Sequence, residues 1–179
     1  TSGNKIYIST SENSFYWTSL GTVNVHNQHY SFETMNQEVL LTSRETSEKM
    51  KKINILTSSM SHLVETTNLS SASIHVKGKY ILNSKNYLIA ANCYDLTTVS
   101  TSFPTRIYYS YFLMPSSFSW NRYIDFRTTG KEDITGIDEL FGRVHIFFPY
   151  SIYELDFTIL EPDPSIGDQR VEKIVSGFG

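Results

Sequence analysis

The feature that most constrains the fold of this chain is a series of short segments in which apolar and polar residues alternate. Residues 5–8, 22–26 and 105–114 show the alternation clearly, with isoleucine, valine and tyrosine at every second position. A period of two residues indicates strands with one buried and one solvated face. Further segments rich in β-branched and aromatic residues are 14–20, 28–33, 73–77, 79–82, 87–91, 119–127, 143–148 and 151–160. We therefore expect a chain rich in antiparallel strands.

One stretch departs from this alternation. Thr42-Ser43-Arg44-Glu45 has the pattern of a capping box, in which a hydroxyl and a carboxylate satisfy free backbone N–H groups at the start of a helix. Beyond it, apolar residues fall in one stripe at helical spacing: Met50, Ile53, Leu56, Met60, Leu63 and Val64. This spacing predicts a long amphipathic helix over about residues 43–65, with Leu56 in the core and Lys51 in solvent. The predicted fold class is α+β, a mainly antiparallel β-sheet wrapped around this one helix.

The length of 179 residues suits one domain with its own hydrophobic core. We expect residues 1–164 to form a single β-rich domain and residues 165–179 a C-terminal tail, because the Glu-Pro-Asp-Pro segment at 161–164 ends the last strand. Cys93 is the only cysteine, so an intramolecular disulfide and a thiolate zinc cage are excluded. No apolar run approaches the roughly 20 residues of a membrane span, and we expect no direct membrane insertion.

The composition favours a binding surface over an active site. Charged residues make up 18% of the chain, below the roughly 25% of average proteins, while 12 tyrosines and 11 phenylalanines are present. A surface of hydroxyl, amide and aromatic groups is typical of extracellular, viral or cell-surface binding modules. The net charge of −3 and the pI near 5.9 argue against a nucleic-acid partner, which requires a basic face.

The sequence carries no motif of a known catalytic or cofactor site: no nucleophile elbow, no glycine-rich phosphate loop and no zinc-protease helix. The H-x-x-H spacing at 26–29 lacks a neighbouring carboxylate or cysteine that would complete a metal site. Ser61 and His62 are adjacent, and Asp95 or Asp125 would complete a catalytic triad. In a serine-rich chain chance alone produces such sets, since triads are defined by geometry. We expect no catalytic residue, no metal and no cofactor.

Aromatic and guanidinium side chains are concentrated in two segments that we expect to be neighbouring strands. In carbohydrate sites an aromatic ring covers the apolar face of a sugar, while arginine and other polar groups bind its hydroxyls. The predicted glycan-binding residues are Trp120, Arg122, Tyr123, Tyr108 and Arg106. Core packing is the alternative for each single aromatic, including both tryptophans.

The predicted layout has strands before Glu33, one helix from near Ser43 and strands from Ser73 to Leu160, and the basic residues Arg170 and Lys173 follow in the tail. In this layout and in composition the chain resembles the cleaved glycan-binding head of a rotavirus outer-capsid spike, of the divergent group B or group G kind, whose precursors are cut at basic residues. The resemblance implies a β-sheet that clasps one helix and glycans of the N-acetyllactosamine type as ligands. It also implies the rest of the spike and other capsid proteins as partners, and a location on the virion surface. No family site motif is matched, so no site residue is carried over.

Two other interpretations remain open. A protruding domain of an insect picorna-like virus capsid would also be β-rich, would hold a Ser-His-Asp set, and would explain residues 175–179 as a polyprotein end. A purely structural domain would turn its aromatic residues towards a partner subunit. Asn68 begins a glycosylation sequon, whose use depends on passage through the secretory pathway.

Overall fold

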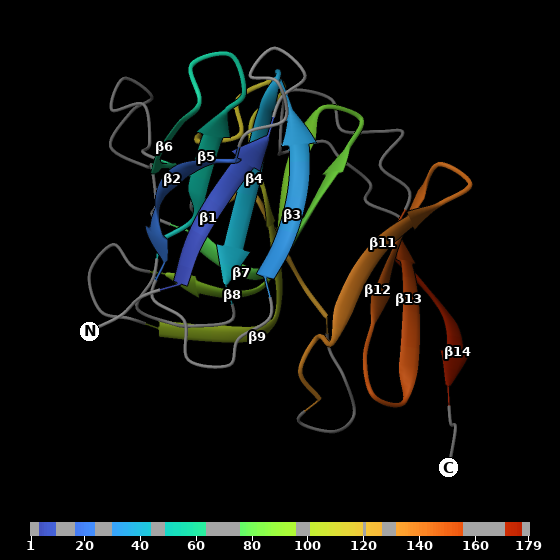
Figure 1. Cartoon of the computed structure of the whole chain (residues 1–179). Helices are drawn as coiled ribbons and strands as arrows, with labels where there is room; N and C mark the ends of the chain where they lie inside the picture. The colour runs from blue at the N-terminus through green and yellow to red at the C-terminus, as the bar shows by residue number, and fades with distance from the viewer. Residues whose placement is uncertain are drawn as a thin grey trace.

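The computed structural model describes residues 4–9, 17–23, 30–43, 49–63, 76–95, 101–119, 121–126, 132–155 and 171–176. Within these ranges it contains strands, turns and irregular connections, and no helix. The strands form four antiparallel sheets there (Figure 1). The expectation of a chain rich in antiparallel strands is thus confirmed.

Each sheet follows the order of the chain. The first is a ribbon of β1 (Asn4–Ser9) and β2 (Trp17–Val23). The second consists of β3 (Tyr30–Met35), β4 (Glu38–Ser43), β5 (Lys51–Asn54) and β6 (Ser59–His62). The third consists of β7 (Val76–Ser84), β8 (Tyr87–Asp95), β9 (Thr101–Tyr109) and β10 (Tyr123–Asp125). The fourth consists of β11 (Gly136–Leu140), β12 (Arg143–Phe147), β13 (Ser151–Leu155) and β14 (Val171–Ser176). Because strands that are adjacent in sequence are also paired, each sheet is a meander.

Two-residue turns set the register of three hairpins. In each turn both residues have a positive φ, which is the type I′ conformation that matches the twist of antiparallel strands. The turns are Asn36–Gln37 (φ 52° and 62°), Lys85–Asn86 (φ 49° and 65°) and Phe141–Gly142 (φ 54° and 75°). The first and third join β3 to β4 and β11 to β12, and the second joins β7 to β8.

Sheet β7–β10 is the central layer and is buried on both faces. One face packs on sheet β3–β6 through a core that includes Leu40, Ile81, Leu88, Ala90 and Tyr108. The other face packs on sheet β11–β14 through a core that includes Ile89, Ile107, Tyr109, Val144 and Ile146. Burial on both sides explains the continuous apolar run of β8, because a strand covered on both faces needs no polar alternate positions.

One edge of sheet β3–β6 meets one edge of sheet β7–β10, where β3 lies beside β7. Side chains join these edges in place of a backbone ladder. Ser31 Oγ accepts a hydrogen bond from the Ile81 N–H at 3.2 Å, and Asn83 Nδ2 donates to the Thr34 carbonyl at 2.8 Å. These bonds satisfy backbone groups that an open sheet edge would leave unpaired.

The predicted helix over residues 43–65 is wrong. The described part of that range contains the end of β4 and all of β5 and β6, which pair with one another. Leu56, expected in the core, is 80% exposed in the turn after β5, whereas Lys51, expected in solvent, is only 7% exposed. Asn54 Oδ1 accepts the Thr57 N–H at 3.0 Å and so closes that turn. Arg44 and Glu45 of the expected capping box lie outside the described residues.

Two further boundaries differ from the sequence-based expectation. Residues 171–176, within the expected tail, form β14 and pair with β13. The strand expected to continue to Met114 ends at Tyr109, because the chain turns there and Leu113 adopts a left-handed φ of 56°.

Candidate functional site

Arg106 on β9 lies at the centre of a group of aromatic and acidic side chains. The register of the edge strand β10 places Tyr123 opposite Tyr108, and Asp125 opposite Arg106. Residues that are directly opposed in an antiparallel pair project from the same face. The ring of Phe103 joins them from the beginning of β9. We call these five residues, Phe103, Arg106, Tyr108, Tyr123 and Asp125, the arginine cluster.

The guanidinium of Arg106 is held by three hydrogen bonds and two rings. Nε and Nη2 each donate to one carboxylate oxygen of Asp125 at 2.7 Å, and Nη1 donates to the Tyr108 hydroxyl at 2.9 Å. This two-pronged geometry is the strongest form of an arginine–carboxylate pair. The guanidinium carbon also lies 4.0 Å from the ring centroid of Phe103 and 3.9 Å from that of Tyr123, within the range of cation–π attraction.

These contacts keep the cluster charged and ordered. Burial lowers the pKa of Arg106, but its hydrogen bonds to Asp125 and Tyr108 outweigh burial and raise the pKa above its ordinary value. The guanidinium itself is largely covered, while the Asp125 side chain is 43% exposed and Tyr123 is 37% exposed. The groups that meet solvent are therefore the Asp125 carboxylate and the Tyr123 ring, and both contact the covered guanidinium of Arg106.

Arg122 does not belong to this cluster. It is only 3% exposed, and its guanidinium carbon lies 4.5 Å from the Tyr111 centroid and 4.8 Å from the Tyr109 centroid. Tyr109 faces sheet β11–β14, whereas Tyr108 faces sheet β3–β6. Among the described residues, Nε of Arg122 has no hydrogen-bond partner.

The structure therefore divides the predicted glycan-binding residues. Arg106, Tyr108 and Tyr123 lie together, Arg122 lies on the other side of the sheet, and Trp120 falls outside the described residues.

Sequence reasoning missed two members of the cluster. Asp125 is two positions after Tyr123, so the alternation of a strand would have placed both side chains on one face. Phe103 gave no such signal, because it is three residues from Arg106 and Pro104 lies between them.

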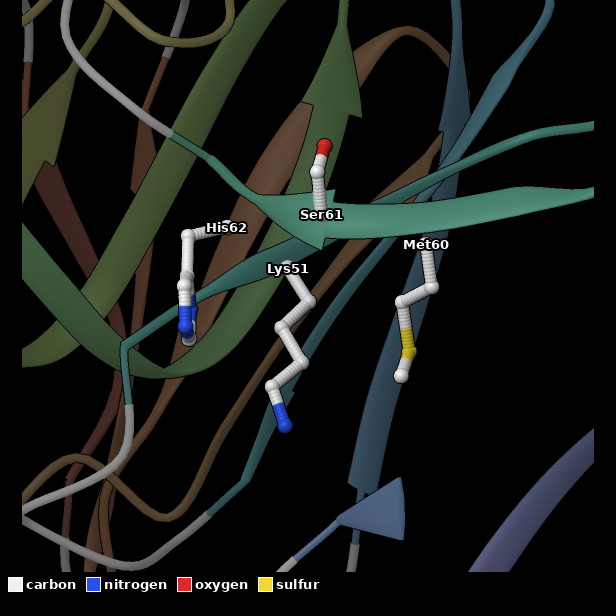
Figure 2. A pocket seen from close by; sticks show the side chains of 4 residues that line it. All are labelled: Lys51, Met60, Ser61 and His62. Atoms are coloured by element: carbon white, nitrogen blue, oxygen red, sulfur yellow. The ribbon is translucent and has the colours of Figure 1, made fainter. Parts of the chain in front are cut away.

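A cavity of about 170 Å³ lies beside β5 and β6, lined by Lys51, Met60, Ser61 and His62. Figure 2 shows the side chains of Lys51, Met60 and His62 on one side of the strands and that of Ser61 on the other. Consecutive residues of a strand point in opposite directions, so Ser61 and His62 do not form the hydrogen-bonded nucleophile–base pair that a hydrolase needs. The Asp125 carboxylate, a candidate third member, is bound to Arg106 instead.

The remaining reactive groups offer no second site in the part of the chain that the structure describes. No three His, Cys, Asp or Glu side chains gather there in a way that would hold a metal ion. Burial raises the pKa of the Cys93 thiol, which stays protonated and donates to the Ala90 carbonyl at 3.0 Å. A buried thiol of raised pKa is a poor nucleophile.

No protein-family model matches this chain, and no curated protein matches its sequence.

Proposed function

We propose that the chain is a carbohydrate-binding domain and that the arginine cluster is its sugar site. The observation that carries the proposal is the exposed pair of Tyr123 and Asp125, fixed side by side on the Arg106 guanidinium. A sugar presents an apolar C–H face surrounded by hydroxyl groups. Its recognition needs an aromatic plate with oriented hydrogen-bonding groups at the rim of that plate. Tyr123 supplies the plate, and Asp125 supplies the rim.

The ion pair leaves hydrogen-bonding capacity for a ligand. Each oxygen of an ionised carboxylate has about two acceptor positions, and Arg106 occupies one on each oxygen of Asp125. The free positions can accept bonds from two neighbouring sugar hydroxyls. Because Arg106 fixes the carboxylate in advance, a ligand does not have to order it.

The affinity of a single site should be low. The cluster is part of an open strand surface, where a sugar gains about −4 kcal/mol, which corresponds to a millimolar dissociation constant. Display of many copies on one particle would raise the effective affinity by about 10²–10⁴ without new contacts.

Specificity for N-acetyllactosamine-type glycans, and a role as a viral attachment head, form a narrower version of this proposal. They are supported by the resemblance in composition and by the abundance of strands. The helix that was part of the resemblance is absent from the described residues. The hydrolase alternative receives no support from the geometry of Ser61 and His62.

A structural role is the second candidate function for the cluster. Tyr108 is buried, and the Arg106–Asp125 pair fastens the short strand β10 to the sheet edge. If the cluster were only a fastener, its residues would affect stability and would not affect binding.

Replacement of Tyr123 by leucine tests the proposal, since leucine keeps an apolar side chain and removes the plate. The wild-type domain, displayed multivalently on a glycan array, is expected to bind a subset of galactose-containing oligosaccharides. Loss of one stacked ring should cost about 1 kcal/mol or more, so Tyr123→Leu should weaken binding at least about fivefold. The control is Tyr150→Leu, which removes another exposed tyrosine and should leave binding unchanged.

Thermal melts, combined with the glycan array, distinguish a sugar-binding role of the cluster from a purely structural one. Asp125→Asn keeps the shape of the side chain but removes its charge, and should reduce both glycan binding and melting temperature. A folded wild-type domain that binds no glycan, together with a lowered melting temperature for Asp125→Asn, would establish the fastener and refute the sugar site.

A further inference from the structure

Exposed apolar side chains gather at one end of the two sheets that contain β3 to β10. Three turns, at residues 36–37, 55–58 and 85–86, reach this end together with the segment 110–117 that follows β9. Figure 1 shows the turns after β3, β5 and β7 at the top of the view. The exposed residues on them are Ile55, Leu56, Phe112, Leu113 and Met114, which we call the apolar end. Single exposed apolar residues are ordinary, but a group of five at one end calls for an explanation.

The structure holds this end in an exposed conformation. The Leu113 N–H donates to the Asn86 carbonyl at 2.9 Å, and the Leu113 carbonyl accepts from Asn36 Nδ2 at 2.8 Å. Leu113 has a φ of 56°, a left-handed conformation that residues with a side chain rarely adopt. The Phe112 ring packs against the Tyr87 ring at a tilt of 60°, with the ring centroids 5.5 Å apart. Two turns thus fix a strained loop whose apolar side chains face water instead of the core. Strain that the surrounding structure maintains is characteristic of functional segments.

The charge of this end is also distinctive. Residues 36–37, 55–58, 85–86 and 111–117 include no acidic residue and one basic residue, Lys85. A second exposed apolar tip, Leu140 and Phe141 on the β11–β12 hairpin, directly follows Asp138 and Glu139. At the apolar end the nearest carboxylate in sequence, Glu38, is paired with Lys52 at 2.9 Å. A carboxylate would lose its hydration at a membrane surface, whereas a lysine beside apolar groups attracts anionic headgroups.

We propose that the apolar end docks on the surface of a lipid bilayer. Leu56, Phe112 and Leu113 would enter the interfacial layer, and Lys85 would meet the headgroups. The exposed apolar side chains project from two separate segments, Ile55 and Leu56 from the turn after β5, and Phe112, Leu113 and Met114 from the segment after β9. Separate projections of this kind fit a deformable bilayer, while a protein partner would need a matching pit for each of them. Docking of this kind is peripheral, and the described residues contain no helix that is long and apolar enough to cross a membrane. The proposal is independent of the sugar site.

Flotation with vesicles that contain no glycolipid tests the proposal. The wild-type chain is expected to float with phosphatidylcholine vesicles, and more strongly when phosphatidylserine is added. Leu56→Ser and Phe112→Ser should each lower the partition coefficient by roughly 5- to 30-fold, as expected for the loss of one buried apolar side chain. Leu56 is 80% exposed, so its substitution leaves the core intact. The matched control is Phe141→Ser, at a fully exposed phenylalanine outside the apolar end, which should float like the wild type.

A fluorescent residue at the tip gives a second, independent measurement. The emission of Phe112→Trp, after subtraction of the wild-type signal, should shift to shorter wavelength on vesicles and be quenched by lipids with brominated acyl chains. Phe141→Trp should show neither effect. A wild-type chain that floats with neither vesicle type would overturn the proposal and leave a protein as the occupant of the apolar end. Equal losses for Leu56→Ser and Phe141→Ser would overturn it too, because binding would then not depend on this end. Since the vesicles carry no sugar, neither result bears on the arginine cluster.

Discussion

Arg106 and Arg122 show how the environment of one residue type decides its role. Both guanidinium groups lie against tyrosine rings within the range of cation–π attraction. Arg106 also meets a carboxylate at the sheet edge and thereby orders two exposed side chains. Arg122 is enclosed between the central sheet and the segment that follows β9, so it contributes to packing. Only the first arrangement presents groups that a ligand can reach.

Glu33 on β3 provides a prediction at the same scale. Burial raises the pKa of Glu33, backbone hydrogen bonds from Asn83 and Thr34 lower it, and the nearby carboxylates of Asp138 and Glu139 raise it further. The resulting pKa of Glu33 lies above its ordinary value. At a pH between these two values the folded state therefore holds a proton that the unfolded state has released. The free energy of unfolding therefore falls as the pH rises from the ordinary pKa to the raised one.

We expect Glu33→Gln to raise the melting temperature at neutral pH, because it removes a charge whose ionised form burial disfavours. The gain should vanish below the ordinary glutamate pKa of about 4.3, where the wild-type side chain is neutral in both states. Melting curves of the wild type and of Glu33→Gln, recorded at neutral pH and at a pH below that value, measure the effect. The two curves at the lower pH serve as the internal control. A Glu33→Gln protein that melts at or below the wild-type temperature at neutral pH would show that neither burial nor the acidic neighbours disfavour the ionised form of Glu33.

At the scale of elements, the β4–β5–β6 meander shows why the helix prediction failed. Apolar residues at 50, 53, 56, 60 and 63 fit a helical stripe, but they also fit two short strands joined by a turn. In the structure Met50 is buried just before β5, Ile53 is buried on β5, and Leu56 lies in the turn after it. Pairing of β5 with β4 and β6 supplies hydrogen bonds and a buried face, and this exceeds the weak helix preference of the segment.

Two leucines test this assignment. Leu40→Ala on β4 should cost about 2–5 kcal/mol, because Leu40 is fully buried between two sheets. Leu56→Ala should change the free energy of unfolding by less than about 0.5 kcal/mol. Denaturant titrations measure both values. A helix with Leu56 in the core requires a cost for Leu56→Ala as large as that for Leu40→Ala, so comparable losses would contradict the three-stranded arrangement.

At the scale of the whole molecule, the fold is a stack in which sheet β7–β10 lies between two others. Gly78 on β7 is tightly enclosed within this central sheet, where an added Cβ would lie 2.7 Å from the Tyr80 carbonyl oxygen and 2.9 Å from the Ala91 nitrogen on β8. The Gly78 carbonyl in turn accepts a hydrogen bond from the buried Thr42 hydroxyl at 2.6 Å. This buried contact joins β4 to β7, in addition to the side-chain bonds between β3 and β7.

We expect Thr42→Val to destabilise the fold by about 1–3 kcal/mol. Valine keeps the shape of threonine but leaves the buried Gly78 carbonyl without its partner. Thr34→Val on the neighbouring strand is the matched control, since this side chain is exposed, and its cost should be close to zero. Chemical denaturation gives both values. A cost for Thr42→Val no greater than that for Thr34→Val would mean that the layers do not depend on this bond.

The sequence by itself determined the features that depend on neighbouring residues. Alternation at 5–8 correctly indicated strand β1, because side chains of a strand point in turn to opposite faces. The β-branched and aromatic residues at 87–91 and 143–148 correctly indicated strands β8 and β12. The surplus of aromatic residues also pointed to the β9–β10 region, where Tyr123 and Arg106 now form a candidate site. The tertiary structure decided the conformation of residues 50–63 and the separation of Arg122 from Arg106. Both depend on which sheet covers which face, and that is set by contacts between distant residues such as Leu40 with the central sheet, which no local pattern contains.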